Sequence, residues 1–558
     1  MSSSNQRRAR GARRLVLLTI VSALLVAVSA SEAVAAASNG LNNGMGTAAA
    51  LNSPQCDKQR GRIKFVYEGW VPCVKPWPAN GNNGGATSPG VTKDSVKVVV
   101  LKPPDEETNT GRSPIKDRAT GALATVEDSV RDTLPMFEKT YQQWGRKLDV
   151  TVVQDSGTDE TAQRADAVKV ASMHPFAVVD LTGGDVFETA VAAKKIVVVG
   201  GSSPNKESIA QAPYRWPVAI DFTTTALAGA ELIGKNFAGK PAKFAGDSNL
   251  QSKKRVFGTV LSDAKTAPDF QPAFAELKKY GVTIAPNASL TYTPSTDPAQ
   301  ASTVADQAAP TLIAKLKDAG VTSILVLPTD YQMIGSLTKA AANNDYHPEW
   351  IVMGVGYADI GALTRTFDQG EWSHAFGVSG LWVPVKDLTA GPSDVAFQWY
   401  WGPNAGAYSQ GVFADFELLF AGIHMAGPKL TPQNFQAGMF SRPPTAGAAE
   451  GHVTDAARYY GKNAGLPYNE YLTGGDVAIV WWDSDTVGPS VAVNLPDAKG
   501  VYQFVDGAKR YKVGDLPANV GNLMFDKAKS IDVLPTTPPN ELAPDYPCDG
   551  CPSATPTS

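Results

Sequence analysis

The chain has 558 residues, of which 43% are hydrophobic, and its formal net charge at neutral pH is −4. This length allows large buried cores and predicts two or more domains. Acidic and basic side chains are mixed along the chain without a stripe of lysine or arginine, which argues against nucleic acid as a partner.

The N-terminus has the features of an export signal. Five arginines between Arg7 and Arg14 precede an uncharged run over residues 15–30, and small residues follow as far as Ala37. This pattern predicts a cleavable secretory signal over residues 1–37. A membrane anchor is the alternative, but the run is shorter than the roughly 20 apolar residues that span a bilayer. We therefore expect an exported, extracytoplasmic protein, with the twin-arginine route left open.

The four cysteines fit an oxidising compartment. Cys56 and Cys73 lie near the start of the mature chain, and Cys548 and Cys551 lie near its end. In an exported protein the simplest interpretation is two local disulfides, although four cysteines allow three pairings. A redox Cys-x-x-Cys site is the alternative for the second pair, but that pair lies in a proline-rich tail and not at a helix start.

After a flexible leader with a disulfide loop over residues 38–93, apolar runs alternate with helical periodicity. The expected strands are 96–101, 148–153, 176–181, 196–199, 242–245, 282–284, 323–327, 350–353, 476–483 and 500–506. The expected helices are 125–144, bent or divided at Pro135, one capped by Thr158, 185–193, 226–237, one ending at Tyr280, 299–319, 331–343, 411–426 and 432–440. This alternation predicts an α/β fold with parallel sheets, in two Rossmann-like doubly wound lobes with a central ligand cleft.

Two predicted strand ends consist of small polar residues. Ligands of doubly wound sheets bind at the carboxyl ends of the strands, where glycine admits a ligand and hydroxyl or N–H groups hold a polar head. The alternative is that the glycines only turn the chain towards a helix. The candidates are Thr182, Gly183 and Gly184 after one strand and Gly201, Ser202 and Ser203 after the next.

Motifs for catalysis, metals and nucleotides are missing from the sequence. It contains no G-x-S-x-G, H-E-x-x-H or G-x-G-x-x-G pattern, and its five histidines lack metal-ligand spacing. We therefore expect no enzyme, no metal site and no cofactor. The aromatic residues Phe257, Tyr331 and Tyr357 near predicted strand ends either cover a ligand or pack in the core.

Several short motifs follow one another in a recognisable order. They are Gly90-Val91-Thr92-Lys93-Asp94-Ser95-Val96-Lys97-Val98, Leu181-Thr182-Gly183-Gly184, Gly201-Ser202-Ser203-Pro204, Phe257-Gly258 and Leu327-Pro328-Thr329-Asp330-Tyr331. In this order they resemble type 1 periplasmic binding proteins, in particular the branched-chain amino-acid-type receptors of ABC transporters. The cysteine-containing ends and Val480-Trp481-Trp482-Asp483 are similar to a longer subgroup of that family.

The resemblance implies two lobes joined by three crossovers, with a solute between them. We expect lobe 1 over residues 94–218 and about 371–455, lobe 2 over residues 219–370 and about 456–530, and a proline-rich tail over residues 531–558.

The resemblance also implies roles for single residues. The family's amino-acid binders hold the ligand carboxylate with hydroxyl groups of two loops; here Ser202 keeps one, and Thr182 keeps one only if it turns inward. The family tyrosine that stacks on the ligand falls near Phe257. The family glutamate that pairs with an amino group falls near Gly356, where no acid stands, which argues against an amino acid as ligand. Asp330 is the candidate for a charge from another strand.

The sequence therefore predicts a monomeric, non-catalytic solute-binding protein. It would deliver a small polar or amphipathic molecule, such as an amino-acid-like compound, an amide or a small carboxylate, to the permease of an ABC importer. An extracytoplasmic sensor without a transport role is the alternative. A hydrolase on a similar scaffold would need a nucleophile beside a base, which the scattered histidines do not suggest.

Overall fold

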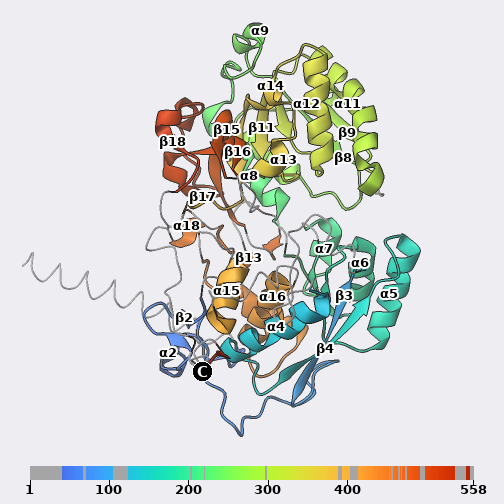
Figure 1. Ribbon diagram of the computed structural model, residues 1–558, viewed down its shortest axis with the longest axis vertical. Coiled ribbons are helices and arrows are strands. Elements are labelled where there is room, and N and C mark those ends of the chain that lie inside the picture. Colours follow the sequence, from blue (N-terminus) through green and yellow to red (C-terminus); the bar gives the residue numbers. More distant parts are fainter. Residues whose placement is uncertain are drawn as a thin grey trace, which may run out of the picture.

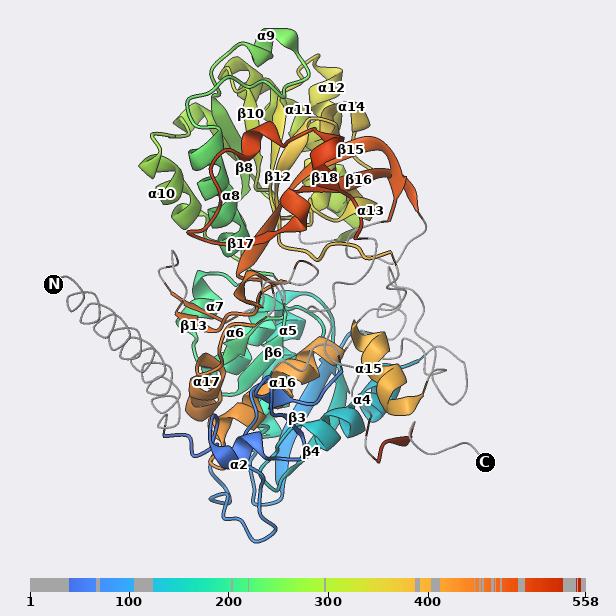
Figure 2. The same cartoon turned by 90° about the vertical axis from the view of Figure 1, so that its left-hand side faces the viewer.

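The computed structural model shows two α/β lobes, with lobe 2 above lobe 1 in Figures 1 and 2. It describes residues 40–66, 71–104, 124–201, 204–218, 220–295, 298–386, 392–402, 412–445, 447–450, 453, 456–462, 466, 468–471, 474–489, 497–534, 548 and 550–552. The expected signal over residues 1–37 lies outside these ranges. Within them, no helix is long and apolar enough to cross a bilayer.

Lobe 1 contains a five-stranded parallel sheet. Its strands, in spatial order, are β4 (Lys147–Gln154), β3 (Ser95–Lys102), β5 (Ala177–Asp180), β6 (Val197–Gly200) and β7 (Arg215–Trp216). Val98 and Val100 of β3 belong to one hydrophobic cluster, and Val99 and Leu101 belong to another. The sheet is therefore covered on both faces, which explains the unbroken β-branched run of this strand.

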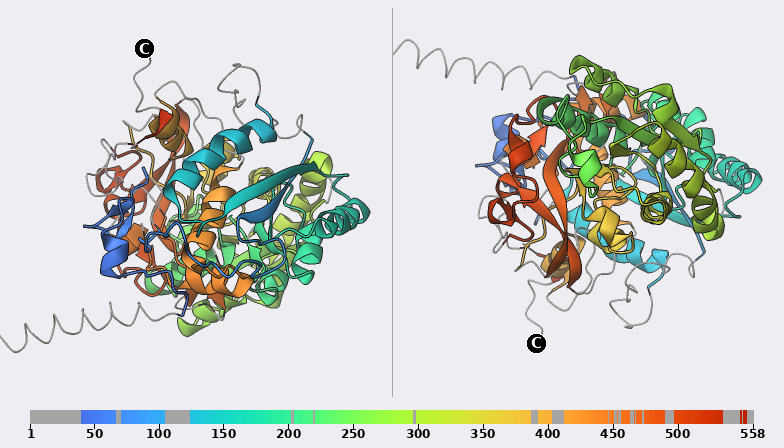
Figure 3. Two further views of the ribbon diagram at one scale, coloured as in Figure 1. Left: turned by 90° about the horizontal axis from the view of Figure 1, so that it is seen from below. Right: turned by 90° about the horizontal axis from the view of Figure 1, so that it is seen from above.

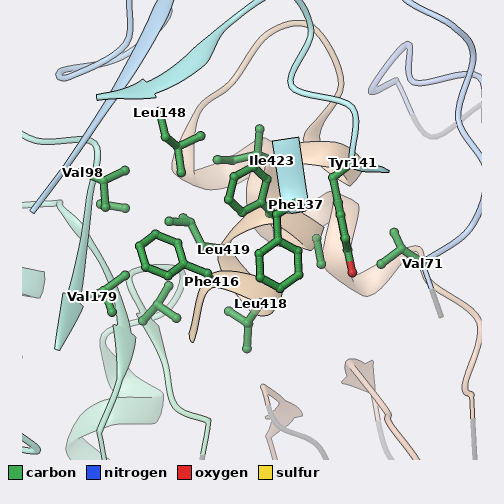
Figure 4. Packing of buried hydrophobic residues seen from close by; sticks show 14 of the residues in the cluster. Val71, Val98, Phe137, Tyr141, Leu148, Val179, Phe416, Leu418, Leu419 and Ile423 are labelled. Atoms are coloured by element: carbon green, nitrogen blue, oxygen red, sulfur yellow. The ribbon is translucent and has the colours of Figure 1, made fainter. Parts of the chain in front are cut away.

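Helices cover the two faces of the first sheet. One face packs against α5 (Glu160–Ser172) and α6 (Asp185–Ala193); the other packs against α4 (Val126–Thr140), α16 (Phe413–Ala426) and α17 (Pro432–Phe440). All but one of the 14 residues of α16 are buried, as expected for a helix that is apolar on every side. Figure 4 shows Phe137 of α4 and Phe416 of α16 beside Val98 and Val179 of the sheet.

The ends of two helices differ from the prediction. α4 runs through Pro135 without dividing and ends at Thr140, because Tyr141 is already extended at ψ 148°. α5 is capped by Asp159 and not by Thr158: the Asp159 carboxylate accepts hydrogen bonds from the N–H groups of Thr161 and Ala162.

Lobe 2 contains nine strands in one mixed sheet. Five are parallel to one another: β9 (Ser289–Tyr292), β8 (Phe257–Ser262), β10 (Ser323–Val326), β11 (Glu349–Met353) and β12 (Ala375–Ser379). The sheet continues antiparallel through β15 (Asp476–Gly488), β16 (Ala498–Val505), β17 (Arg510–Lys512) and β18 (Ser530–Ile531). Both lobes are thus α/β with predominantly parallel central strands, and the predicted fold class is confirmed.

Helices also cover both faces of the second sheet. α8 (Phe222–Asn236) and α10 (Gln271–Lys279) pack on one face, and α11 (Ala301–Asp318), α12 (Tyr331–Asn343) and α14 (Gln369–Trp372) pack on the other. The remaining α-helices of the described chain are α2 (Ala48–Leu51), α7 (Lys206–Ala210), α9 (Ser248–Gln251), α13 (Gly361–Thr364), α15 (Pro392–Trp401) and α18 (Gly447–Glu450).

Two predicted strands of lobe 2 are wrong. Residues 242–245 and 282–284 form no strand, and the strands of this region are β8 and β9, which begin at Phe257 and Ser289. Ala242, Ala245 and Val282 are nevertheless buried. Burial gives a short loop the same apolar composition as a strand, so periodicity cannot separate the two.

The crossings between the lobes fall later than the resemblance implied. β12 and the rest of residues 371–386 lie in lobe 2, not lobe 1. Tyr471, next to β14 (Asn469–Glu470) and β13 (Gly461–Lys462), packs in the core of lobe 1, not lobe 2. A fourth crossing follows Leu534 of the lobe 2 core, because Cys548 and Cys551 belong to the core of lobe 1.

The N-terminal segment is part of lobe 1 and not a flexible leader in its described residues. The Asn43 side chain donates to the carbonyl oxygen of Met425 at 2.8 Å, and Phe65 stacks on Phe137 at 5.8 Å between ring centroids. A disulfide joins Cys56 and Cys73 across β1 (Cys56–Asp57) and β2 (Arg62–Ile63), and Cys548 is paired with Cys551. Figure 3, seen from below, shows this blue segment beside the orange helices of residues 413–440.

Candidate functional site

The carboxyl ends of the parallel strands of both lobes point towards the junction between the lobes. The segment after β6 and the segment after β8 touch there: the Asn205 side chain donates to the carbonyl oxygen of Thr266 at 3.5 Å, and Lys206 lies 3.4 Å from Asp269. In Figure 2, α7, which begins at Lys206, lies at the side of lobe 1 that faces lobe 2. We call residues 181–184 and 200–201 the lobe 1 loops, and residues 327–331, 354–357 and 380–382 the lobe 2 loops.

The first lobe 1 loop is organised by Asp180, the last residue of β5. Its Oδ1 accepts hydrogen bonds from the N–H of Thr182 at 3.0 Å and from the Thr182 hydroxyl at 2.7 Å. The Thr182 hydroxyl is therefore bonded to Asp180 within lobe 1 and does not turn towards a ligand. Gly183 is exposed, has a left-handed φ of 69° and has no atom within 4 Å of a would-be Cβ, and Gly184 is the N-cap of α6.

The second lobe 1 loop begins at Gly200 and Gly201. Their φ values of 122° and 85° favour glycine, and a Cβ on Gly201 would collide with the carboxyl group of Glu188. The need for glycine at these two positions is thus explained by packing within lobe 1. Ser202 and Ser203, the predicted hydroxyl donors of this loop, lie outside the described residues.

Under both loops lies a buried charged cluster that the sequence analysis missed. Arg215, at the start of β7, contacts Glu188 and donates twice to Asp185 Oδ1, at 3.0 Å each. Glu188 and Asp180 are each 2% exposed. Burial and then the neighbouring charge of Asp180 raise the pKa of Glu188 well above its ordinary value, and burial raises the pKa of Asp180. These residues lie on β5, α6 and β7, and no spacing in the sequence links them.

The lobe 2 loops carry the exposed aromatic residues of the described chain. Tyr331, Tyr357 and Trp382 are 36%, 42% and 40% exposed, and no other large aromatic side chain in the described ranges is as open. They follow β10, β11 and β12, which are neighbours in the sheet. Their side chains therefore form an aromatic edge on lobe 2, to which the sequence analysis had assigned Tyr331 and Tyr357 but not Trp382.

The acidic groups near this aromatic edge are engaged within lobe 2. Asp330 caps α12, accepting from the N–H of Met333 at 2.7 Å and from the hydroxyl of Tyr292. Asp359 is buried and accepts from the Ser379 hydroxyl at 2.8 Å, and burial raises its pKa. Asp330 was predicted to offer a charge to the ligand, but its carboxylate already accepts hydrogen bonds as the N-cap of α12.

Phe257 does not lie at this site. It is the first residue of β8, is paired in register with Ser323 at the start of β10, and is only 5% exposed. The strands are parallel, so Phe257 lies at the opposite end of the sheet from Tyr331 and Tyr357. The prediction placed it after a strand because residues 242–245 were taken as that strand; its side chain instead packs in the lobe 2 core.

The described part of the molecule includes a small recess and a larger open groove. A recess of about 10 Å³, room for one water, lies beside the lobe 1 loops and is lined by Arg215, Ser208 and residues 468–471. A groove of about 620 Å³ lies on the outer edge of lobe 1, between α4 and β4. Among the described residues no three His, Cys, Asp or Glu side chains are grouped so that they could hold a metal ion.

No protein-family model and no curated protein matches this chain. Several solved structures are similar to it. One is a putative branched-chain amino acid ABC transporter from Rhodospirillum rubrum, with 10% identity and a TM-score of 0.43 over 70% of this chain and 97% of that one. A second is an ABC transporter substrate-binding protein from Aeropyrum pernix, with 12% identity and a TM-score of 0.45 over 76% and 97%. A third is an ABC transporter solute-binding protein from Rhodopseudomonas palustris BisB5 in complex with 3,4-dihydroxybenzoic acid, with 12% identity and a TM-score of 0.42 over 77% and 99%. At these identities and TM-scores the likenesses identify no ligand for this chain.

Proposed function

We propose that this protein is an extracytoplasmic solute-binding protein that takes one small molecule between its two lobes. The observation that carries the proposal is the opposition of two strand-end edges, one polar and one aromatic, which belong to different lobes. Strand-end edges are where ligands bind in doubly wound sheets, and a small-molecule site combines apolar walls with a few polar groups.

The polar end of the solute would lie on lobe 1. In the described part of the chain, nothing accepts a hydrogen bond from the amide N–H groups of Gly183 and Gly201. These amides favour a hydrogen-bond acceptor, such as a carbonyl or carboxylate oxygen.

The apolar body of the solute would lie on lobe 2. Tyr331, Tyr357 and Trp382 offer ring faces and edges at low cost in side-chain entropy. Asp330 and Asp359 accept hydrogen bonds within the lobe, so neither is available as the main partner of an ammonium group. We therefore propose an amphipathic solute with an acceptor at one end, such as a small carboxylate or amide, ahead of a free α-amino acid.

The transport role is part of the same proposal. The resemblance of the ordered motifs to receptors of ABC transporters supports delivery of the bound solute to a permease, and the N-terminal sequence supports export. Closure of the lobes on the solute would create the surface that such a permease recognises.

A thermal-shift screen followed by calorimetry tests the binding function. The panel contains aromatic and aliphatic carboxylates, their amides and the free amino acids, each added to the purified mature protein. We expect one saturable site for at least one compound, loss of the shift in Tyr357→Ala, and no loss in Val168→Ala, which changes an exposed valine of α5. No saturable binding by any class of compound, or equal binding by both variants, would contradict the proposal.

A further inference from the structure

Beneath the lobe 1 loops, buried carboxyl groups outnumber the cations beside them. Arg215 shares its N–H groups between Glu188 and Asp185, and Asp180 lies next to Glu188. Three carboxyl groups thus surround one guanidinium. Surplus negative charge is costly to bury, and a group in this position usually binds a proton instead.

The hydrogen bonds show where a proton is needed. Asp180 uses Oδ1 to accept from Thr182, and Glu188 uses Oε2 to accept from Arg215. The other oxygens, Asp180 Oδ2 and Glu188 Oε1, are buried, and no described N–H or O–H group donates to them. The two carboxyl groups are within hydrogen-bonding reach of each other. One proton between them satisfies both oxygens.

Both lobe 1 loops depend on these two side chains. Asp180 holds Thr182, and the Glu188 carboxyl fills the space that a side chain on Gly201 would need. The cluster also reaches lobe 2, because Asp185 accepts from the Asn205 side chain at 3.3 Å and the same amide donates to Thr266. A change in the charge of Asp180 and Glu188 would therefore affect both lobe 1 loops and the contact between the lobes.

We propose that Asp180 and Glu188 share one proton, and that this proton holds the lobe 1 loops in the conformation that binds the solute. The shared proton stands by itself, whereas its effect on the solute rests on the proposed function. Loss of the proton brings two like charges into contact in a medium of low dielectric constant, and their repulsion separates Thr182 and Gly201. Solute affinity then falls as the pH rises, by up to about tenfold for each pH unit above the point of deprotonation.

Few other titratable groups lie near Asp180 and Glu188 that could cause this response to pH. α6 contributes Asp185 besides Glu188, β7 contributes Arg215, and α5 contributes the uncharged Gln163, whose Oε1 accepts from the N–H of Phe187 at 3.2 Å. No histidine is among the groups that shift the pKa of either carboxyl. Burial raises the pKa of both carboxyl groups, which favours a bound proton.

The test uses Glu188→Gln, whose amide keeps a donor for Asp180 and an acceptor for Arg215 but has no proton to lose. Amide hydrogen exchange of peptides over residues 178–190 and 197–210 is measured in the mature protein without solute, from neutral to alkaline pH and relative to intrinsic rates. We expect wild-type protection to fall on the alkaline side and Glu188→Gln protection to stay constant. Asp166→Asn, a change at another buried acid of lobe 1 that accepts only from Ser156 in the described chain, should behave as the wild type.

Infrared spectroscopy of the wild type keeps the idea testable even if Glu188→Gln does not fold. A carbonyl stretch from a protonated carboxyl group should be present at neutral pH and vanish on alkaline titration. Its absence at neutral pH, or exchange curves that are the same for wild type and Glu188→Gln, would overturn the shared proton.

Solute binding separates the two proposals. If a compound of the panel binds wild type and Glu188→Gln with the same affinity at every pH, the regulation fails and the solute-binding function stands. If the loops respond to pH as expected but no compound binds, the solute-binding function fails and the shared proton stands.

Discussion

The strand-end edges of lobe 1 and lobe 2 differ in the charged groups that are buried beneath them. In lobe 1, three carboxyl groups surround Arg215 under loops of glycine. In lobe 2, Arg510 pairs with Asp476 at 3.0 Å and lies near the buried Asp359, and its other N–H groups donate to backbone carbonyl oxygens. Lobe 2 instead exposes aromatic rings. The comparison shows that lobe 1 buries a surplus of carboxyl groups beneath its strand ends, whereas lobe 2 exposes aromatic rings at its strand ends.

The largest expected effect comes from removing Arg215, the cation of the buried cluster under the lobe 1 loops. Arg215→Met leaves Asp185 and Glu188 without their guanidinium, and breaking a buried charge pair in this way costs about 3–5 kcal/mol. The free energy of unfolding from urea titration measures the loss. Arg164→Met, which removes an exposed arginine of the same lobe, should change it by less than about 0.5 kcal/mol. Equal values for the two variants would refute the special role of Arg215.

The disulfide of the N-terminal segment should stabilise lobe 1 alone. Cys56 and Cys73 are 17 residues apart, and a loop of that size corresponds to about 3 kcal/mol. The double variant Cys56→Ala/Cys73→Ala should lose about this much, and amide exchange should increase around Phe65 and Phe137, which stack on each other. Faster exchange in lobe 2, which has no described cysteine, would show that the lobes are not independent in this respect.

Two histidines should give the lobes opposite responses to pH. Burial lowers the pKa of His424, in lobe 1, to about 4 from an ordinary 6.5, so this group costs stability as the pH falls from 6.5 towards 4, by at most about 3 kcal/mol. The hydrogen bond to Glu371 raises the pKa of the partly exposed His347, in lobe 2, so its contribution is present at low pH and is lost as the pH rises through that raised pKa.

Unfolding free energies measured against pH test this contrast. His424→Gln should flatten the curve on the acidic side, and His347→Gln should remove a decline on the neutral side. Changes in the same direction for both variants would contradict the opposite pKa shifts.

The smallest expected effects belong to the aromatic edge. Trp382→Ala and Tyr331→Ala should each weaken solute binding by about 2 kcal/mol, or roughly thirtyfold in Kd, because each removes one ring from the apolar wall. Since both side chains are more than a third exposed, the free energy of unfolding should change by less than about 0.5 kcal/mol. Calorimetry with a solute from the panel gives the first number and urea titration the second. A variant that loses stability and keeps its affinity would place that ring in the core and not at the site.

Much of the fold follows from local signals. The β-branched run of β3 is buried on both faces, and the bounds of α6, α12 and α17 agree with the predicted 185–193, 331–343 and 432–440. The strand predictions at 242–245 and 282–284 failed because a buried loop is as apolar as a strand. That failure also misplaced Phe257 at the end of a strand that it begins.

The sequence by itself determined the α/β class, the order of strands and helices, and the two glycine-containing strand ends, because all of these depend on residues that are neighbours along the chain. Only the tertiary structure decided that Asp180, Glu188 and Arg215 form one cluster, that Trp382 joins Tyr331 and Tyr357, and that Thr182 and Asp330 are occupied within their own lobes. The physical reason is that these relations join residues on different strands and helices. Strand order and packing, which no local pattern records, set the distances between them.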